Sequence, residues 1–326
     1  MKTNNGFIPT KFMFLAILAL LNTSGFQPSV VKSHLSENYQ IFFPMIWAPG
    51  RIVYRNWLDG FNEIYYMNAD GLGQTRVTHD YDIDCRGNGN FDPSWSPDRK
   101  RIVYSSTCDG FGEIYIINID GTNKTRLTFT TDTNEFPAWS PDGTKIAFDN
   151  QIDILVMNVD GTGIINLTPI EDGAIAIAPA WSSDGTKIVF SQRDLCGYLG
   201  CDLNDIYIMN ADGTGVKQLT QNINAQDYDP HLSPDGSKIV FFSGRDTTNY
   251  DIFVMNADGS QITNLTNVLT GGFQDISPTW SPDGKQIAFE SYLYPDGPTH
   301  IFVMNTDGTN LVDISNSEFS SLQPCW

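Results

Sequence analysis

The chain has 326 residues, of which 40% are hydrophobic and 12% aromatic, a composition that indicates a packed globular protein and excludes an intrinsically disordered one. Its formal net charge of −19 at pH 7 excludes nucleic acid as an expected partner, because phosphate binding needs a basic surface. An anionic membrane surface is disfavoured for the same reason.

The N-terminal segment differs in composition from the rest of the chain. Lys2 and Lys11 precede an apolar run over residues 12–21, which small and polar residues follow. This order is typical of a secretory signal peptide, and the run is too short to span a bilayer, which requires about 20 apolar residues. An uncleaved anchor is the alternative. The expected organisation is a signal peptide over 1–25, a short leader over 26–40 and a single domain over 41–326.

One sequence pattern recurs through the remainder of the chain. Its first element combines Pro-x-Trp-Ser-Pro-Asp-Gly with Ile-Ala-Phe or a close variant, as in "FPAWSPDGTKIAF" (136–148) and "SPTWSPDGKQIAF" (277–289). The prolines of this element lie at positions 93, 137, 179, 230 and 278, so the period is 42 to 51 residues. The second element, Ile-Tyr-x-Met-Asn-x-Asp-Gly or a variant, precedes a short piece that ends in Leu-Thr. It occurs six times, at 64–71, 114–121, 154–161, 206–213, 252–259 and 301–308.

Each repeat unit predicts four short β-strands. β-Branched and aromatic residues dominate the four segments, which suits a pleated, half-buried sheet. Ser-Pro-Asp-Gly joins the first two segments and Asn-x-Asp-Gly the last two, and both are expected to form tight turns because Pro and Gly supply the required φ angles. Four antiparallel strands repeated every 40 to 50 residues or so describe the blade of a β-propeller. A β-solenoid is the competing architecture, but its rungs are shorter and lack two hairpin turns per repeat.

These elements resemble the TolB-type, WD40-like propeller repeat, and the resemblance covers residues 51–326. It implies an all-β propeller and says little about function, because one fold hosts many functions. The sequence departs from TolB itself, which carries an α/β domain ahead of its propeller. Here only about 25 residues separate the expected cleavage site from the first strand. This departure argues against membership of the Tol envelope machinery.

The two ends of the repeat region carry complementary defects. Residues 323–326 (QPCW) match the start of a blade with nothing after it, whereas the strand at 52–54 lacks a complete first segment ahead of it. Because a ring must join its ends, residues 321–326 are expected to form the innermost strand of the first blade. Six third-strand motifs then predict a six-bladed propeller closed by its C-terminal strand. In the alternative, Ile41–Trp47 forms that strand.

Chain direction assigns the connections to two faces. Both tight turns emerge on one face, while the loops between second and third strands and the loops between blades emerge on the other, which we call the looped face. Variable loops on a rigid scaffold are where binding usually resides, and aromatics beside carboxylates suit a sugar or a peptide. Packing of each aromatic onto its own loop is the alternative. The candidate ligand-binding residues are Trp57, Phe61, Asp92, Phe111, Tyr198, Asp227, Asp229, His231, Tyr292 and Tyr294, with Asp82 and Asp84 in a neighbouring loop.

Two sets of repeated residues are expected to be structural. One set occupies a single repeat position and should pack between blades: Trp95, Trp139, Trp181 and Trp280. The other set precedes the third strands, away from the axis, and should make structural hydrogen bonds: Glu63, Glu113, Asp153, Asp205 and Asp251.

Signatures of catalysis are absent from the sequence, which has neither a Gly-x-Ser-x-Gly elbow nor a His-Glu-x-x-His zinc motif. His231 is expected to meet Asp229 near the channel mouth, an arrangement that would suit a metal-using lyase, with a packing role as the alternative. No loop has the spacing of a known calcium motif. We therefore expect no catalytic residues, no metal ligands and no cofactor, with calcium on the acidic loops as the option left open.

Five cysteines in an exported chain predict disulfides and one unpaired thiol. Cys196 and Cys201 lie in one loop, and Cys85 and Cys108 lie in two loops that flank one blade on the same face, so both pairs are expected to be bonded. Cys325, inside the closing strand, is expected to be free and buried.

The sequence therefore favours a non-catalytic, monomeric propeller in the periplasm or outside the cell, which binds a protein or glycan through its looped face. No nucleic acid partner is expected, and no membrane insertion after signal cleavage. A polysaccharide-degrading, lyase-like propeller enzyme and an accessory propeller of an envelope or peptidase complex are the alternatives.

Overall fold

The structure is a computed structural model of the chain. The expected signal peptide, the leader and the alternative closing strand at 41–47 lie outside the residues that it describes. These residues are 50–58, 60–80, 85, 87–169, 173–193, 203–221, 225–245, 249–266, 274–292, 298–315 and 320–326.

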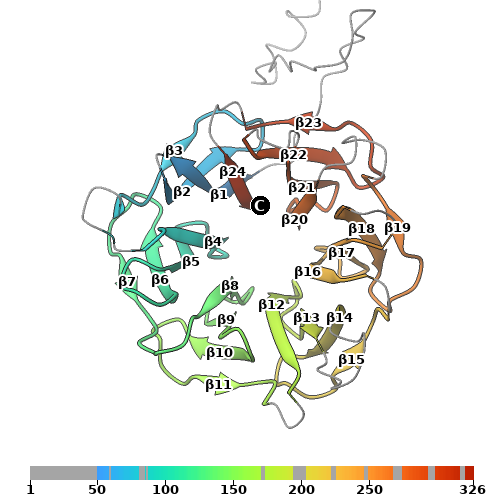
Figure 1. Cartoon of the computed structure of the whole chain (residues 1–326), viewed down its shortest axis with the longest axis horizontal. Helices are drawn as coiled ribbons and strands as arrows, with labels where there is room; N and C mark the ends of the chain where they lie inside the picture. Colours follow the sequence, from blue (N-terminus) through green and yellow to red (C-terminus); the bar gives the residue numbers. More distant parts are fainter. Residues whose placement is uncertain are drawn as a thin grey trace, which may run out of the picture. The chain divides into compact units, whose positions relative to one another are not determined.

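The described residues form six four-stranded antiparallel sheets arranged as blades around a central axis (Figure 1). This confirms the expected six-bladed, all-β propeller. The innermost strands are β4 (Asn90–Trp95), β8 (Glu135–Trp139), β12 (Ile175–Trp181), β16 (Asp227–Leu232), β20 (Asp275–Trp280) and β24 (Ser321–Cys325). The second strands are β1 (Arg51–Leu58), β5 (Arg101–Ser106), β9 (Lys145–Asp149), β13 (Lys187–Arg193), β17 (Lys238–Ser243) and β21 (Gln286–Ser291).

The outer half of each blade contains a third strand and a short rim strand. The third strands are β2 (Phe61–Asn68), β6 (Glu113–Asn118), β10 (Ile154–Asn158), β14 (Asn204–Asn210), β18 (Asp251–Asn256) and β22 (His300–Asn305). The rim strands are β3 (Thr75–Arg76), β7 (Thr125–Arg126), β11 (Ile165–Asn166), β15 (Lys217–Gln218), β19 (Thr263–Asn264) and β23 (Val312–Asp313). We number the blades in chain order, so that blade one consists of β24, β1, β2 and β3.

The C-terminal strand closes the ring, as the incomplete repeats at the two ends predict. β24 pairs antiparallel with β1, and Val53 lies opposite Cys325 and Asn56 opposite Ser321. Figure 1 shows β24 (red) beside β1 (blue) in one blade. The closing strand also bonds to blade six, because the Gln323 backbone N–H donates to Glu290 Oε2 at 2.9 Å.

The Ser-Pro-Asp-Gly turns adopt one hydrogen-bonded geometry. In blade three, the Ser140 hydroxyl donates to the Asp142 carboxylate at 2.6 Å and accepts from the Lys145 backbone N–H at 2.9 Å. Gly143 has a φ of 72°, a left-handed conformation that glycine adopts without steric penalty. The same Ser–Asp bond recurs in the other complete repeats, at Ser96–Asp98, Ser182–Asp184, Ser233–Asp235 and Ser281–Asp283.

The hydrophobic core lies between blades rather than within them. Each cluster of buried residues draws on two neighbouring blades, and the repeat tryptophans take part in them as expected. Trp95, for example, packs with Val53 and Ile64 of blade one and with Ile102 of its own blade. Because each blade has no core of its own, the stability of each depends on its neighbours.

The acidic residues at or beside the start of the third strands make structural hydrogen bonds, also as expected. Glu63, which is 1% exposed, pairs with Arg76 of the rim strand at 2.6 Å and accepts a hydrogen bond from Thr78. In blade six the acid lies on the rim strand instead: His300 occupies the position on the third strand, and its Nδ1 atom lies 2.7 Å from Asp313 Oδ2. The equivalent pairs are Glu113–Arg126, Asp153–Asn166, Asp205–Gln218 and Asp251–Asn264.

Replacing Trp326 tests the closing strand. Trp326 is 6% exposed, so Trp326→Ala should lower the free energy of unfolding by about 3–5 kcal/mol through the cavity it leaves. Trp57→Ala is the matched control, because Trp57 is 41% exposed and its removal should have an effect below about 1 kcal/mol. Urea unfolding of the two variants, followed by circular dichroism, measures both. Equal losses would contradict the role assigned to β24.

Candidate functional site

Every innermost strand contains a bulge at the residue before its proline. The pairing between first and second strands shifts register at this point in all six blades. The residue before the proline has a left-handed φ between 50° and 53° in each case, which is uncommon outside glycine. Because the bulge re-aims the side chain, the same position faces the axis from six directions. These residues are Asp92, Phe136, Ala178, Asp229, Ser277 and Gln323.

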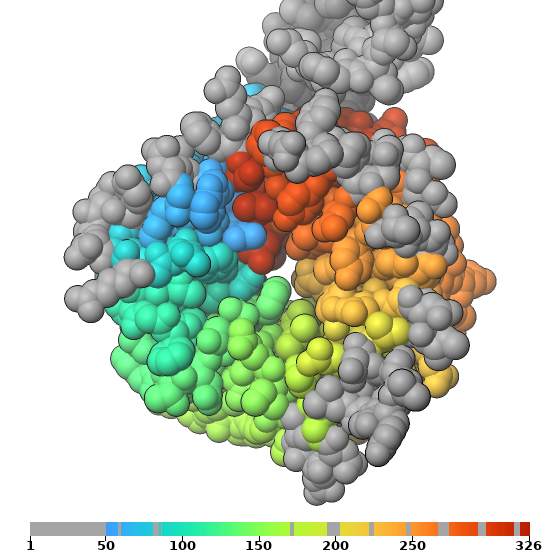
Figure 2. All heavy atoms as spheres, in the orientation of Figure 1, coloured from blue at the N-terminus to red at the C-terminus, as the bar shows by residue number. Residues whose placement is uncertain are grey.

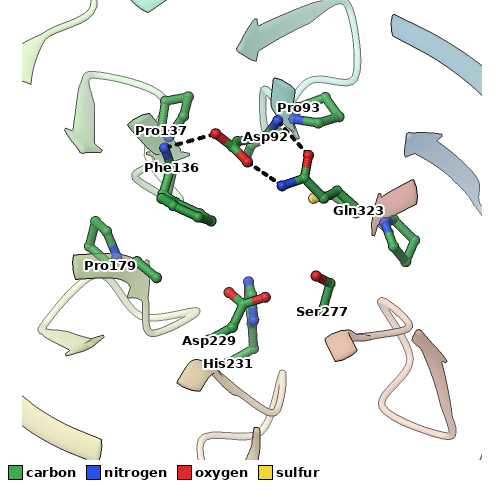
Figure 3. Close-up of a pocket in the computed structure, with 14 residues that line it drawn as sticks. Asp92, Pro93, Phe136, Pro137, Pro179, Asp229, His231, Ser277 and Gln323 are labelled. Carbon is green, nitrogen blue, oxygen red and sulfur yellow. Dashed lines mark hydrogen bonds between the residues drawn. The ribbon is translucent and has the colours of Figure 1, made fainter. Parts of the chain in front are cut away.

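The six bulge residues line a cavity at the propeller axis (Figure 3), and Figure 2 shows the ring open at this point. The cavity volume is about 80 Å³, which admits a few waters or the end of one side chain. His231 and Cys325, each two residues beyond a bulge residue, also line it. The sequence-predicted candidates Asp92, Asp229 and His231 are therefore brought together.

Hydrogen bonds occupy the carboxylate of Asp92. Gln323 Nε2 donates to Asp92 Oδ1 at 2.5 Å, and the Ser105 hydroxyl donates to Oδ2 at 2.8 Å. The backbone N–H of Phe136 lies 3.4 Å from the same Oδ2. Burial raises the pKa of Asp92, and these bonds and the charge of Arg55 oppose that increase.

Asp229 has different surroundings, although its backbone conformation is the same. Its backbone N–H donates to Ser191 Oγ at 3.1 Å, but no described residue donates a hydrogen bond to its carboxylate. Burial raises the pKa of Asp229, and the neighbouring His231 lowers it. The Nδ1 atom of His231 is buried and has no hydrogen-bond partner among the described residues.

Two more buried carboxylates hold bulge residues of the next blade in place. Asp149 Oδ2 accepts from the Ala178 backbone N–H at 2.9 Å, as Glu290 does from Gln323. Burial raises the pKa of Asp149 to about 8 and that of Glu290 to about 7. Both side chains are 1% exposed, so they act through the backbone they bind rather than on the surface.

On the looped face, the structure exposes some of the predicted aromatics and buries others. Trp57 is 41% exposed and Phe111 57% exposed, whereas Phe61 is only 6% exposed. The segment 55–62 is not an open loop: β1 and β2 continue their pairing to Leu58 and Phe61, which makes Phe61 a strand residue. The aromatic ring of Phe61 is therefore not available to a ligand on the surface.

The other candidates have internal partners or lie elsewhere. Asp227 is fully buried and pairs with Arg245 at 2.5 Å, so its role is structural. Tyr292 is partly buried, and burial and the charge of Glu290 raise its pKa to about 12. Four candidates, Tyr198, Tyr294, Asp82 and Asp84, lie outside the described residues.

Several residues of the site were not predicted from the sequence. Phe136, Ala178, Ser277 and Gln323 share the position before the repeat proline, and aligning the six units on that proline would have identified them. On the looped face, Phe129 is 76% exposed and Ile152 is 49% exposed. Phe129 directly follows the Leu-Thr that ends a repeat unit, and Ile152 lies in the short connection between β9 and β10. At these positions no sequence signal separates an exposed apolar residue from a packed one.

The predicted bond between Cys85 and Cys108 is present in the structure. It ties the connection between blades one and two to the loop over 107–112, which carries Phe111. Cys325 is free, as expected, but it is only partly buried and lines the axial cavity, whereas a buried thiol was expected. The bulge at Gln323 and Pro324 turns this part of the strand toward the axis. Cys196 and Cys201 lie outside the described residues.

Comparison with known proteins identifies the family. The TolB beta propeller domain matches residues 42–169 and 171–267, more than half of the chain. The chain belongs to the TolB beta propeller domain family. Crystal structures of TolB support the same fold for this TolB-type propeller. TolB from Acinetobacter baumannii is 20% identical with a TM-score of 0.69, and the match covers 86% of this chain and 68% of that chain.

Two further solved structures show how widely this fold is shared. A putative TolB from Agrobacterium tumefaciens is 22% identical over 81% of this TolB-type chain and 88% of its own, with a TM-score of 0.61. Oligogalacturonate lyase from Vibrio parahaemolyticus is 15% identical over 82% and 73% of the two chains, with a TM-score of 0.54. At these identities the similarity shows the fold alone.

The described part of the chain contains no helix that is long and apolar enough to cross a membrane. It also contains no group of three or more His, Cys, Asp or Glu side chains placed to hold a metal ion.

The buried acid Glu290 predicts a pH dependence of stability. Its pKa is raised from 4.5 to about 7 in the folded state, so the folded protein binds this proton more tightly than the unfolded chain does. Stability should therefore fall as the pH rises from about 4.5 to about 7. Glu290→Gln keeps an acceptor for the Gln323 N–H and should remove on the order of 2 kcal/mol of this decline. Urea unfolding at pH 5 and pH 8 measures it, and an unchanged slope in Glu290→Gln would refute it.

Mass mapping of the non-reduced protein tests the cysteine assignments. Peptides joined by Cys85–Cys108 and by Cys196–Cys201 should be recovered, and Cys325 should react with iodoacetamide once the protein is denatured. A peptide in which Cys325 is bonded to another cysteine would contradict both the pairing and the position of β24.

Proposed function

We propose that this propeller is an exported, non-catalytic binding protein that holds a polypeptide partner on the looped face. The observation that carries the proposal is the set of exposed apolar side chains on this face of blades one to three. Isolated exposed apolar residues are ordinary, but several on adjacent strand ends and loops at one end of a rigid fold indicate an interaction site. They are Trp57, Phe111, Phe129 and Ile152.

The loops that carry these residues are held in place by the fold. The Asn134 backbone N–H donates to Gly112 O at 2.8 Å, which joins the loop of Phe111 to the segment that follows Phe129. The Arg126 guanidinium lies 4.8 Å from the centre of the Phe129 ring and also pairs with Glu113 at 2.6 Å. A surface ordered before binding loses less conformational entropy when the partner arrives.

The chemistry of the exposed residues favours a polypeptide over a glycan. Ile152 offers no flat ring for a sugar to stack on, and Arg126 already covers one face of Phe129. Apolar side chains distributed over three blades suit the alternating side chains of an extended polypeptide or the apolar side of a helix. The axial cavity, at about 80 Å³, admits one side chain rather than a sugar ring.

Export and the absence of catalysis are parts of the same proposal. The Cys85–Cys108 disulfide favours an oxidising compartment, in the periplasm or outside the cell. A lyase acting through Asp229 and His231 has less support, because the described residues place no third His, Cys, Asp or Glu with this pair in a metal-binding group. The proposed binding requires no cofactor, and the propeller acts as a monomer toward its partner.

Co-purification from the native cell envelope tests the proposal. The triple variant Trp57→Ala/Phe111→Ala/Phe129→Ala should capture at least tenfold less polypeptide than the wild-type protein does. The matched control is Leu72→Ala/Ile165→Ala, which removes two side chains that are 55% and 57% exposed at the tight-turn end and should capture the partner normally. Equal capture by both variants, or binding on a glycan array in place of a polypeptide, would overturn the proposal. Identification of the partner as an envelope protein or a peptidase would assign the propeller to such a complex.

A further inference from the structure

The first tight turn of blade two differs from its counterparts in the other blades. Five blades contain this turn, and its fourth residue is Arg99 in blade two but glycine in the other four: Gly143, Gly185, Gly236 and Gly284. Arg99 has the same left-handed backbone as these glycines, with a φ of 59°, which is unfavourable for a residue that carries a Cβ atom. Residues held in such a conformation are concentrated at functional sites.

The side chain of Arg99 is half-buried and pairs with no described carboxylate. Its guanidinium lies 5.5 Å from the centre of the Trp95 ring, and its Nη1 atom donates to the backbone oxygen of Arg51 at 3.3 Å. A guanidinium group has five N–H donors, so most of them remain open to a ligand. Burial lowers the pKa of Arg99, because a cation that is partly removed from water is destabilised unless an anion accompanies it.

A second guanidinium group lies near that of Arg99 at the tight-turn end, opposite the looped face. Arg51 is exposed, and its guanidinium lies 4.9 Å from the centre of the Tyr66 ring. The rings of Tyr66 and Trp95 are neighbours across the boundary between blades one and two, with centroids 6.2 Å apart. The two guanidinium groups are therefore stacked on adjacent rings, and the exposed Lys100 adds a third positive charge next to Arg99.

Other cations of blades one and two already have anionic partners. Three of them pair with buried acids at 2.6 Å: Arg76 with Glu63, Lys124 with Asp80 and Arg126 with Glu113. The acid next to Arg99 in the sequence is Asp98, but its carboxylate accepts hydrogen bonds within the turn, from the Ser96 hydroxyl at 2.6 Å and the Lys100 backbone N–H at 3.1 Å. Arg99 and Arg51 are thus a pair of cations that the fold leaves without an anion among the described residues.

We propose that the tight-turn end of blades one and two binds one phosphate group between Arg99 and Arg51. Guanidinium groups donate to oxyanions through a planar fork and keep their charge at every physiological pH. A phosphate dianion gains from two cations, whereas one fork satisfies a carboxylate. The headgroup of a phospholipid and a soluble phosphorylated compound are the two sources of such a group.

The formal charge of −19 is compatible with an anion at this end of the molecule. Ten basic residues lie in or beside the tight turns, against eleven turn aspartates, so the tight-turn end is almost neutral. The excess of acids belongs to the rest of the chain, and the field of an exposed charge is largely screened beyond about 8 Å at physiological ionic strength. Local cations therefore decide whether an anion binds here.

Titration of the purified protein with inorganic phosphate tests the site. The titration is followed by NMR in a HEPES buffer at pH 7.5, with sodium acetate at matched ionic strength as the comparison. We expect a millimolar dissociation constant for phosphate and binding of acetate that is about tenfold weaker, since acetate has one negative charge and a single fork satisfies it. Equal binding of the two anions would overturn the assignment to phosphate.

Two variants and one control assign the binding to the named residues. Arg99→Gly restores the residue of the other blades, and it should weaken phosphate binding about tenfold or more, the loss expected for one charge-assisted hydrogen bond. Arg51→Gln leaves the turn unchanged and should weaken binding severalfold. The control Lys187→Gln removes one positive charge from the same end in blade four, where Lys187 bonds Asn210, and should leave binding unchanged. Equal weakening in the control would reduce the effect to general charge and overturn the site.

Thermal unfolding separates binding from a structural role of Arg99. If the residue is kept for its ligand, Arg99→Gly should raise the Tm of the unliganded protein, because it removes both the left-handed strain and the half-buried charge. If Arg99 acts only by packing on Trp95, the same variant should have a lower Tm and unchanged phosphate binding. That second result would overturn the inference.

Vesicles distinguish the two sources of the phosphate group. Sedimentation with phosphatidylcholine vesicles that contain phosphatidic acid is compared with pure phosphatidylcholine vesicles, for the wild-type protein and for Arg99→Gly. Binding that needs both phosphatidic acid and Arg99 would assign the site to a lipid headgroup, and binding of inorganic phosphate without vesicle binding would assign it to a soluble compound. If neither binds through Arg99, the inference falls, and the proposed function, which uses the opposite face, is unaffected.

Discussion

The pairing of β24 with β1 is the interaction on which the rest of the structure depends. A propeller places its hydrophobic core between blades, so a ring that failed to close would leave two apolar blade faces and a strand edge exposed to water. The last six residues prevent this, because they complete blade one and bring Trp326 into the core. They also place Gln323 at the axis, where it bonds Asp92. Closure of the ring and assembly of the axial cavity are therefore one event.

The repeated residues stabilise the ring, and the residues that differ between blades determine the chemistry of the axial cavity. The tryptophan, the Ser-Pro-Asp-Gly turn and the hydrogen bonds of the rim strand recur from blade to blade and hold the ring together. The residue before the repeat proline has the same left-handed conformation in every blade, yet its identity ranges from Ala178 to Phe136 and Asp229. A constant backbone with a variable side chain lets one ring present six different groups to a single small space.

The surroundings of a residue, rather than its type, decide what it does in this ring. Asp92 and Asp229 share a residue type, a repeat position and a φ angle, but only Asp92 has donors for both carboxylate oxygens. Burial raises the pKa of both. The difference comes from the neighbouring blades, since Gln323 of blade one donates a hydrogen bond to Asp92, whereas no described residue donates one to the carboxylate of Asp229.

The sequence by itself determined the four-stranded blade, the count of six blades, the closing strand and the Cys85–Cys108 bond. Each of these follows from the local periodicity, the turn residues and the incomplete repeats at the two ends, all of which can be read directly from the sequence. Only the tertiary structure decided that Phe61 is buried in a continuous hairpin, that Cys325 lines the cavity, and that Gln323 hydrogen-bonds Asp92. The residues that line the cavity come from six separate repeats, and their contacts depend on how the bulges aim them toward the axis. No local pattern carries that information, because side chains from separate blades meet only once the ring has closed.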